Sequence, residues 1–179
     1  MTIHLILGGA RSGKSRYAEH CVSEFAHQSN KHYIATAIAF DEEMKARIAH
    51  HQRSRGDSWT EHECPTELAT LLTRFDSGDV VLVDCLTLWL NNIIYNDGVA
   101  LSENQIQQRV SELVEVLGTT SAQVILVSNE VGLGVVPMGE VSRLFVDNAG
   151  WMNQAIAKVA EQVTFVAAGL PMTLKGAKA

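Results

Sequence analysis

Cysteine, proline and positive charge are all scarce in this sequence of 179 residues, which holds three cysteines, three prolines and 14 Lys and Arg against 20 Asp and Glu. Cys21, Cys64 and Cys85 are odd in number, far apart and without a Cys-x-x-Cys pair, so neither a disulfide framework nor a zinc knuckle is expected. The net charge of −6 excludes a general nucleic-acid binder, which needs a surplus of positive charge to neutralise phosphates.

Long apolar runs are absent as well. No run approaches the ~20 residues that span a bilayer, and no basic residue precedes the apolar N-terminus as it would in a signal peptide. We therefore expect a cytoplasmic protein without a membrane span. The remaining composition, 46% hydrophobic and 19% charged, is ordinary for a globular protein. The length predicts one domain over residues 1–179, large enough to fold without metals or disulfides.

Short apolar runs alternate with helical patterns along the chain. We expect strands over residues 3–7, 33–38, 80–83, 124–127 and 164–168. We expect helices over residues 14–28, 41–53, 66–75 and 147–163, a short one over 86–90, a loop over 91–101 and a helix that begins after a capping box of Ser102 and Gln105. This alternation predicts an α/β fold with a mostly parallel sheet and helices on both faces.

A phosphate-binding loop is predicted where the first strand meets the first helix. The pattern G-x-x-x-x-G-K-[ST] begins at Gly8 and covers Gly8, Gly9, Ala10, Arg11, Ser12, Gly13, Lys14 and Ser15. Glycines let backbone N–H groups surround phosphate oxygens, the lysine reaches the β- and γ-phosphates, and the serine hydroxyl can bind Mg²⁺. The position between a strand and a helix is the one that this mechanism requires. The motif and its position therefore predict a P-loop nucleotide-binding protein.

Polar residues lie at the carboxyl ends of two later predicted strands. Asp84 follows the run Val80–Val83 and so lies at the end of a strand beside the phosphate loop. There it is a candidate base, or a second Mg²⁺ ligand in addition to Ser15. The alternative is that Asp84 only caps the next helix. Ser128, Asn129 and Glu130 follow the fourth strand, and the sequence leaves open whether they contact nucleotide, substrate or neighbouring loops. No Asn-Lys-x-Asp motif is present, which argues against a GTPase of the Ras kind.

Two adjacent histidines lie on the predicted helix 41–53. On a helix His51 shares an apolar stripe with Met44 and Ile48, whereas His50 shares a polar stripe with Glu43 and Arg47. An exposed imidazole beside arginines suits attack on a phosphate ester, because much of it is neutral at pH 7. The alternative is a solvated surface helix with histidines near its C-terminal end. A metal site of His50, His51, His62 and Cys64 matches no standard spacing.

Taken together, these segments give the sequence a close resemblance to a known family. The matching segments are GGARSGKSRYAE, YIATA, DEEMKARIAHHQRSR, the pair Trp59 and Glu63, VLVDCLTLWLNN, VSNEVGLGVVP and DNAGWMNQAIA, in order over nearly the whole chain. The chain resembles the bifunctional adenosylcobinamide kinase / adenosylcobinamide-phosphate guanylyltransferase family of cobalamin biosynthesis. The resemblance implies a RecA-like P-loop sheet, a homotrimer and two reactions.

In the first implied reaction ATP or GTP phosphorylates the hydroxyl of adenosylcobinamide. In the second, GTP gives GMP to adenosylcobinamide phosphate through a GMP-histidine intermediate, which yields adenosylcobinamide-GDP and pyrophosphate. The resemblance places that histidine at His50, and the helical-face argument prefers the same residue. Besides the phosphate loop, it implies nucleotide contacts at Ala35, Thr36, Ala37, His51, Gln52, Arg53, Ser54, Glu63 and Asp84, the last at a position where many relatives have Glu.

Two other classes compete with this interpretation. A simple P-loop kinase of small molecules would need no nucleophilic histidine, and a RecA-like ATPase that binds DNA would need basic loops. The charge is unevenly divided, since residues 1–55 carry a net +3 and residues 56–179 a net −9. The basic part holds both the phosphate loop and the histidines, which suits a small polyphosphate ligand. With so short a chain, we expect one nucleotide pocket to serve both reactions.

Overall fold

The computed structural model describes residues 2–25, 29–38, 58–95 and 101–176. Its centre is a seven-stranded sheet in the order β3-β2-β4-β5-β1-β6-β7. The strands are β1 (Ile3–Gly8), β2 (Asn30–Ala35), β3 (Trp59–Glu63), β4 (Asp79–Asp84), β5 (Gln123–Asn129), β6 (Gln162–Ala167) and β7 (Leu170–Lys175). The first six are parallel and β7 is antiparallel to β6, which confirms the predicted mostly parallel α/β sheet.

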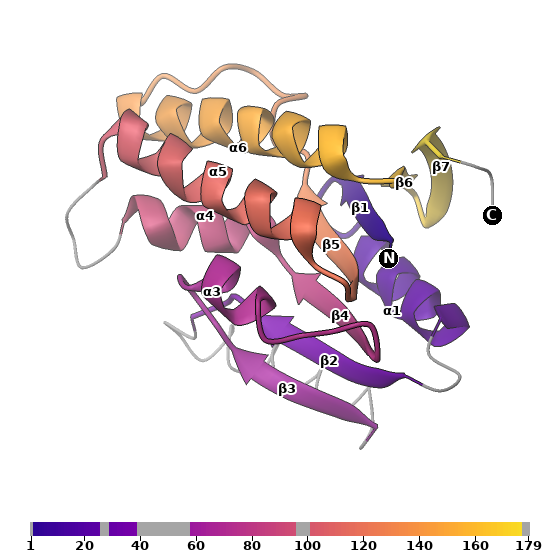
Figure 1. Ribbon diagram of the computed structural model, residues 1–179. Helices are drawn as coiled ribbons and strands as arrows, with labels where there is room; N and C mark the ends of the chain where they lie inside the picture. The colour runs from indigo at the N-terminus through magenta and orange to yellow at the C-terminus, as the bar shows by residue number, and fades with distance from the viewer. Residues whose placement is uncertain (1, 26–28, 39–57, 96–100, 177–179) are drawn as a thin grey trace.

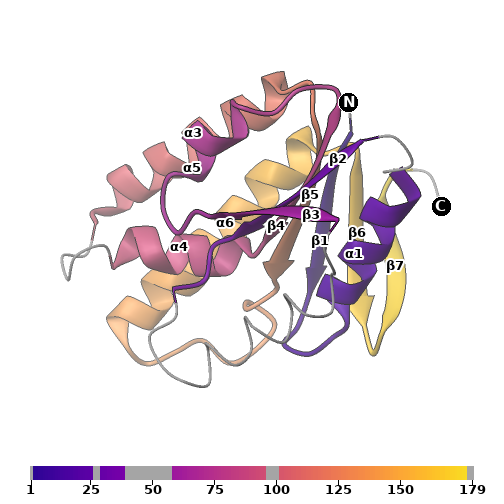
Figure 2. The same cartoon turned by 90° about the horizontal axis from the view of Figure 1, so that it is seen from below.

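Helices cover both faces of this sheet, as expected. They are α1 (Lys14–Phe25), α3 (Leu68–Leu72), α4 (Leu86–Ile94), α5 (Glu103–Thr119) and α6 (Glu140–Val159). Figure 1 shows α4, α5 and α6 together on one side of the sheet and α1 on the other, and Figure 2 gives the same arrangement from below. The chain passes to α1 directly from β1, so the loop between them lies at the carboxyl edge of the sheet.

The alternation of side chains along the central strands divides the core in two. Ile6 of β1 packs with Ala18 and Val22 on the α1 side, whereas its neighbours Leu5 and Leu7 face the larger cluster under α3–α6. All six residues of β1 are buried, as a central parallel strand requires. The helix predicted after the capping box is likewise confirmed as α5. Ile106, Val110, Leu113 and Leu117 form its buried stripe, and the backbone N–H of Ser102 donates to Gln105 Oε1 at 3.0 Å.

Several predicted boundaries were wrong. The strands β3 and β7 were not predicted, because both are short edge strands without a run of buried apolar residues. Helix α6 begins at Glu140 rather than at residue 147, and it ends at Val159, so that residues 162 and 163 belong to β6. Residues 91–94 continue α4 instead of opening a loop, because Asn92, Ile93 and Ile94 are buried. The predicted helix 41–53 lies outside the described residues.

Candidate nucleotide-binding site

The carboxyl ends of five strands gather the described site residues at one edge of the sheet. Gly8 pairs with Asn129 across β1 and β5, while Ala35 pairs with Glu63 on β3 and with Asp84 on β4. Ligands of parallel α/β sheets bind at this edge. Since neighbouring strands are about 4.8 Å apart, Asp84 lies about 10 Å across the sheet from the base of the phosphate loop.

The phosphate loop has the backbone that anion binding requires. Arg11 has φ 55 and Gly13 has φ 94, so left-handed residues interrupt the turn, as they do in backbone nests that point N–H groups at an anion. The N–H of Ser12 donates to Gly9 O at 3.3 Å. The Lys14 ammonium donates to Gly9 O at 3.0 Å, which folds the lysine back over the loop. Lys14 also begins α1, whose N-terminal dipole favours negative charge.

The turn between β6 and β7 supports the phosphate loop from the side. The N–H of Gly169 donates to Ser12 O at 2.8 Å. A Cβ on Gly13 would lie 3.1 Å from Gly169 Cα, and a Cβ on Gly8 would lie 2.5 Å from Val166 O. Both glycines are therefore required by close contacts with the backbone of residues 166–169. Sequence reasoning missed this support, because β7 was not predicted.

Ser15 and Asp84, the predicted Mg²⁺ ligands, both lie at this edge and are partly exposed. A hydroxyl and a carboxylate are hard oxygen donors, and Mg²⁺ commonly takes one or two protein oxygens and completes its shell with phosphate oxygens and water. The donor set therefore fits the ion. Burial raises the pKa of the Cys85 thiol, the Asp84 carboxylate raises this pKa further and the Lys14 ammonium lowers it, so both charges act on the same buried residue.

Thr36, a predicted nucleotide contact, is fully buried at the end of β2. Its hydroxyl donates to Cys85 O at 2.7 Å and accepts from Cys85 N at 2.8 Å. The side-chain amide of Asn92 donates to the carbonyls of Thr36 at 2.7 Å and Pro65 at 3.1 Å. The Thr36 side chain thus joins β2 to the residue after Asp84, whereas its neighbours Ala35 and Ala37 are partly exposed.

A second polar network, whose role the sequence left open, holds the end of β5. Asn129 Nδ2 donates to Thr87 Oγ1 at 2.8 Å, and Ser128 Oγ donates to Asn153 Oδ1 of α6 at 2.7 Å. The N–H of Glu130 donates to Gly8 O at 3.1 Å. The ends of β5 and β1 are therefore joined at the phosphate loop. The only sequence signal was the polar run that follows an apolar strand.

Two predicted groups lie apart from this network. Glu63 ends β3 and is exposed at the outer edge of the sheet. The second group lies outside the described residues and consists of His50, His51, Gln52, Arg53 and Ser54. In the sequence this group falls between residue 38, which follows β2, and residue 58, which precedes β3.

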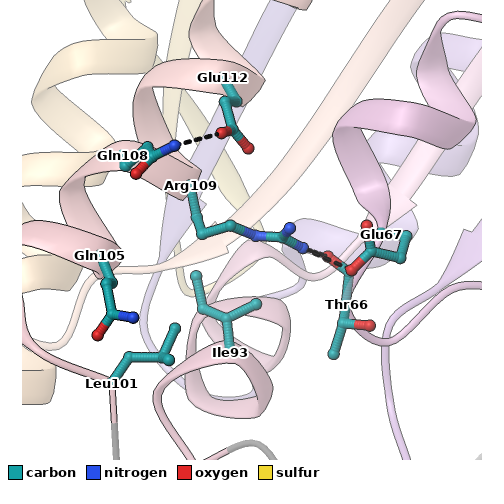
Figure 3. A pocket seen from close by; sticks show the side chains of 8 residues that line it. All are labelled: Thr66, Glu67, Ile93, Leu101, Gln105, Gln108, Arg109 and Glu112. Atoms are coloured by element: carbon teal, nitrogen blue, oxygen red, sulfur yellow. Dashed lines mark hydrogen bonds and ion pairs between the residues drawn. The ribbon is translucent and has the colours of Figure 1, made fainter.

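A separate cavity of about 330 Å³ lies between α3, α4 and α5 (Figure 3). Its charged groups already have partners within the cavity, since Arg109 donates to Glu67 Oε1 at 2.7 Å and to Thr66 O at 2.9 Å. Gln108 donates to Glu112 at 3.1 Å. Of the predicted site residues that the structure describes, none lines this cavity.

A glycine-rich loop between a buried strand and a helix, in a parallel sheet with a carboxylate at a nearby strand end, defines a P-loop nucleotide-binding protein. Solved structures agree with this fold. The flagellar accessory protein FlaH from Methanocaldococcus jannaschii aligns with a TM-score of 0.53 at 14% identity, over 98% of this chain and 78% of that one. No helix among the described residues is long and apolar enough to cross a membrane.

The family follows from sequence comparison. The chain belongs to the cobinamide kinase / cobinamide phosphate guanyltransferase family, whose model matches residues 4–174. It is 51% identical over 173 residues to the bifunctional adenosylcobalamin biosynthesis protein CobP of Pseudomonas aeruginosa, covering 96% of each chain. It is 36% identical to the bifunctional adenosylcobalamin biosynthesis protein CobU of Salmonella typhimurium, covering 96% of this chain and 98% of that one.

Proposed function

We propose that this protein carries out both reactions of its family on one nucleotide site. It phosphorylates adenosylcobinamide with ATP or GTP, and it then transfers GMP from GTP to adenosylcobinamide phosphate. The observation that carries this proposal is the phosphate loop, with the Lys14 ammonium 3.0 Å from Gly9 O and left-handed residues at Arg11 and Gly13. Family membership over residues 4–174 supplies the substrate class.

In the first reaction the substrate hydroxyl attacks the γ-phosphorus of the nucleotide. A new P–O bond forms, the bond to the β-phosphate oxygen breaks, and the hydroxyl proton leaves to solvent or to a carboxylate. The loop N–H groups and Lys14 stabilise the charge on the transferring group. Ser15 and Asp84 would hold Mg²⁺, which when bound neutralises phosphate charge. Asp84 orients the hydroxyl or the ion.

In the second reaction His50 attacks the α-phosphorus of GTP. A P–N bond forms, the bond to the β-phosphate oxygen breaks, and pyrophosphate leaves into the phosphate loop. A phosphate oxygen of adenosylcobinamide phosphate then attacks the same phosphorus and displaces the histidine, giving adenosylcobinamide-GDP. Two displacements allow one pocket to hold each partner in turn. His50 must be neutral to attack, so this reaction slows at acidic pH.

The other assignments are part of the same proposal. Family resemblance supports further nucleotide contacts at Ala35, Ala37, His51, Gln52, Arg53, Ser54 and Glu63, a homotrimer and a cytoplasmic location. Of these contacts, Ala35, Ala37 and Glu63 lie at the carboxyl edge of the sheet. The predicted nucleotide contact at Thr36 would be made by its backbone, since its side chain is buried.

Labelled GTP tests the proposal. The protein is incubated with GTP labelled at the α-phosphate, denatured, and examined for retained label that survives base and is lost in acid, as a phosphoramidate is. We expect label on the wild type and none on His50→Ala, while His51→Ala retains label. A wild type without label, or a His50→Ala variant that labels equally, would refute the covalent mechanism. Transfer of γ-label to adenosylcobinamide tests the kinase reaction separately.

A further inference from the structure

The loop between β5 and α6 exposes an unusual run of apolar side chains. Leu133, Val135, Val136 and Met138 are between 72% and 96% exposed. Isolated exposed apolar residues are common in proteins, whereas a contiguous group marks an interaction site. We call these four residues the apolar loop.

The segment that carries the apolar loop begins beside the phosphate loop. It follows Glu130, whose N–H donates to Gly8 O at 3.1 Å, and runs from there to the start of α6. Figure 2 shows the chain leaving the arrowhead of β5 on the side of the sheet where β1 passes into the phosphate loop. A large acceptor whose hydroxyl reaches a γ-phosphate in the phosphate loop would have room to extend along this segment.

The protein holds the apolar loop at both ends. At the start, Glu130 Oε1 accepts the N–H of Gly132 at 2.9 Å. At the end, Arg143 of α6 donates to the carbonyls of Pro137 and Met138. The exposed side chains are therefore presented from an anchored segment, which lowers the entropy lost when a ligand binds them.

The charged residues that flank the apolar loop in the sequence are both acidic. Residues 131–139 carry no charge, Glu130 precedes them and Glu140 follows them. Arg143, the cation in the first turn of α6, is engaged with backbone carbonyls. An apolar surface between two carboxylates suits a ligand with an apolar rim and a positive centre.

We propose that the apolar loop is the docking site of the corrinoid, with its side chains against the methylated rim of the corrin ring and Glu130 and Glu140 facing its positive charge. The corrinoid is a macrocycle with peripheral methyl groups and a cobalt(III) centre whose charge the ring does not fully neutralise. The inference rests on the proposed function for the identity of the substrate. A second copy of the chain, as in the proposed homotrimer, is the competing occupant, and sedimentation of the loop variants distinguishes it from the corrinoid.

Serine substitutions in the apolar loop test the proposal. The variants are Leu133→Ser, Val135→Ser, Val136→Ser and Met138→Ser, whose side chains are so exposed that folding should be unaffected. The matched control is Leu174→Ser, which is 61% exposed. Leu174 lies next to Lys175, which pairs with Val163 near the start of β6, so it is at the opposite edge of the sheet from the phosphate loop.

We expect each loop variant to raise the KM for adenosylcobinamide in the kinase reaction about tenfold, and the pair Leu133→Ser/Val136→Ser about 100-fold. The KM for nucleotide and the uptake of α-label from GTP stay within about twofold of wild type. Val136→Leu keeps an apolar side chain and should therefore keep the wild-type KM for adenosylcobinamide. Leu174→Ser behaves as wild type.

Two results would overturn the proposal: an unchanged KM for adenosylcobinamide in all four variants, or sedimentation of the loop variants as smaller species than wild type, which would assign the loop to contacts between copies. Equilibrium dialysis with adenosylcobinamide, which is coloured, measures binding without either reaction. A wild type that binds the corrinoid but performs no transfer would therefore refute the proposed function while the loop variants still test the docking site.

Discussion

Removal of one buried hydroxyl, in Thr36→Val, should destabilise the junction that follows Asp84. Thr36 is fully buried, and its hydroxyl both accepts from Cys85 N at 2.8 Å and donates to Cys85 O at 2.7 Å. Valine preserves the shape and removes both hydrogen bonds. Cys85 O keeps a second donor, Trp89 N at 3.1 Å, whereas Cys85 N has no second acceptor within the part of the chain that the structure describes.

The magnitude follows from that asymmetry. A buried N–H left without a partner costs about 1–3 kcal/mol, and the second lost hydrogen bond adds about 1 kcal/mol, so we expect a loss of about 2–4 kcal/mol. That is a large share of the 5–15 kcal/mol typical of a folded domain. The control is Thr36→Ser, which keeps the hydroxyl and loses one methyl group, at a cost of about 1 kcal/mol.

Urea unfolding followed by circular dichroism measures both variants against wild type. The expected order of stability is wild type, Thr36→Ser and then Thr36→Val, with similar dependence on urea concentration in all three. The reasoning is refuted if Thr36→Val is as stable as Thr36→Ser, because the hydroxyl would then contribute nothing at this position. Since Cys85 follows Asp84, the kinase rate of Thr36→Val should also fall below that of Thr36→Ser.

Three further predictions concern the loop and the core. Gly13→Ala should raise the KM for nucleotide at least about tenfold, because φ 94 strains any L-residue by about 1–3 kcal/mol and the new Cβ would lie 3.1 Å from Gly169 Cα. Gly8→Ala should lower the free energy of unfolding by about 1–3 kcal/mol, because its Cβ would lie 2.5 Å from Val166 O. Burial lowers the pKa of His4 from 6.5. Below pH 6.5 the unfolded chain therefore takes up a proton that the folded chain does not. The free energy of unfolding should fall as the pH drops below 6.5, by at most about 1.4 kcal/mol per pH unit.

The two stability predictions each have a control in the same chain. Gly9→Ala is the control for Gly8→Ala in the unfolding assay, because a Cβ at Gly9 meets nothing within 4 Å and should leave stability unchanged. Equal destabilisation by Gly9→Ala would contradict the close-contact argument. His4→Gln can keep a hydrogen bond to Thr164 and cannot titrate, so its stability should depend less on pH. An unchanged pH dependence would show that another group titrates.

The central strands and the phosphate loop could be predicted because strong local signals agree there with the fold. β1, β4 and β5 are mostly apolar and are buried on both faces, and α5 carries both a capping box and a buried stripe. The glycine spacing of the loop likewise predicts a backbone conformation, since few other residues adopt the φ of Gly13.

The edges of the sheet and the supports of the site could not be predicted, because they depend on contacts between distant segments. The sequence of β3 is Trp-Thr-Glu-His-Glu, which has no apolar run that would predict a strand. Its pairing with β2 defines it as one. The hydrogen bond from Gly169 to Ser12 joins segments more than 150 residues apart, and the bonds between Thr36 and Cys85 join the ends of two strands. No local pattern encodes such pairs.

The central claim is that one phosphate loop serves both the kinase reaction and the GMP transfer. The most direct measurement compares the two rates in Lys14→Ala, using transfer of γ-label to adenosylcobinamide and uptake of α-label from GTP by the protein. Because Lys14 would stabilise the γ-phosphoryl group in one reaction and the leaving pyrophosphate in the other, both rates should fall by about 100-fold or more. Loss of the kinase reaction with GMP uptake at the wild-type rate would contradict the claim and require a second nucleotide site.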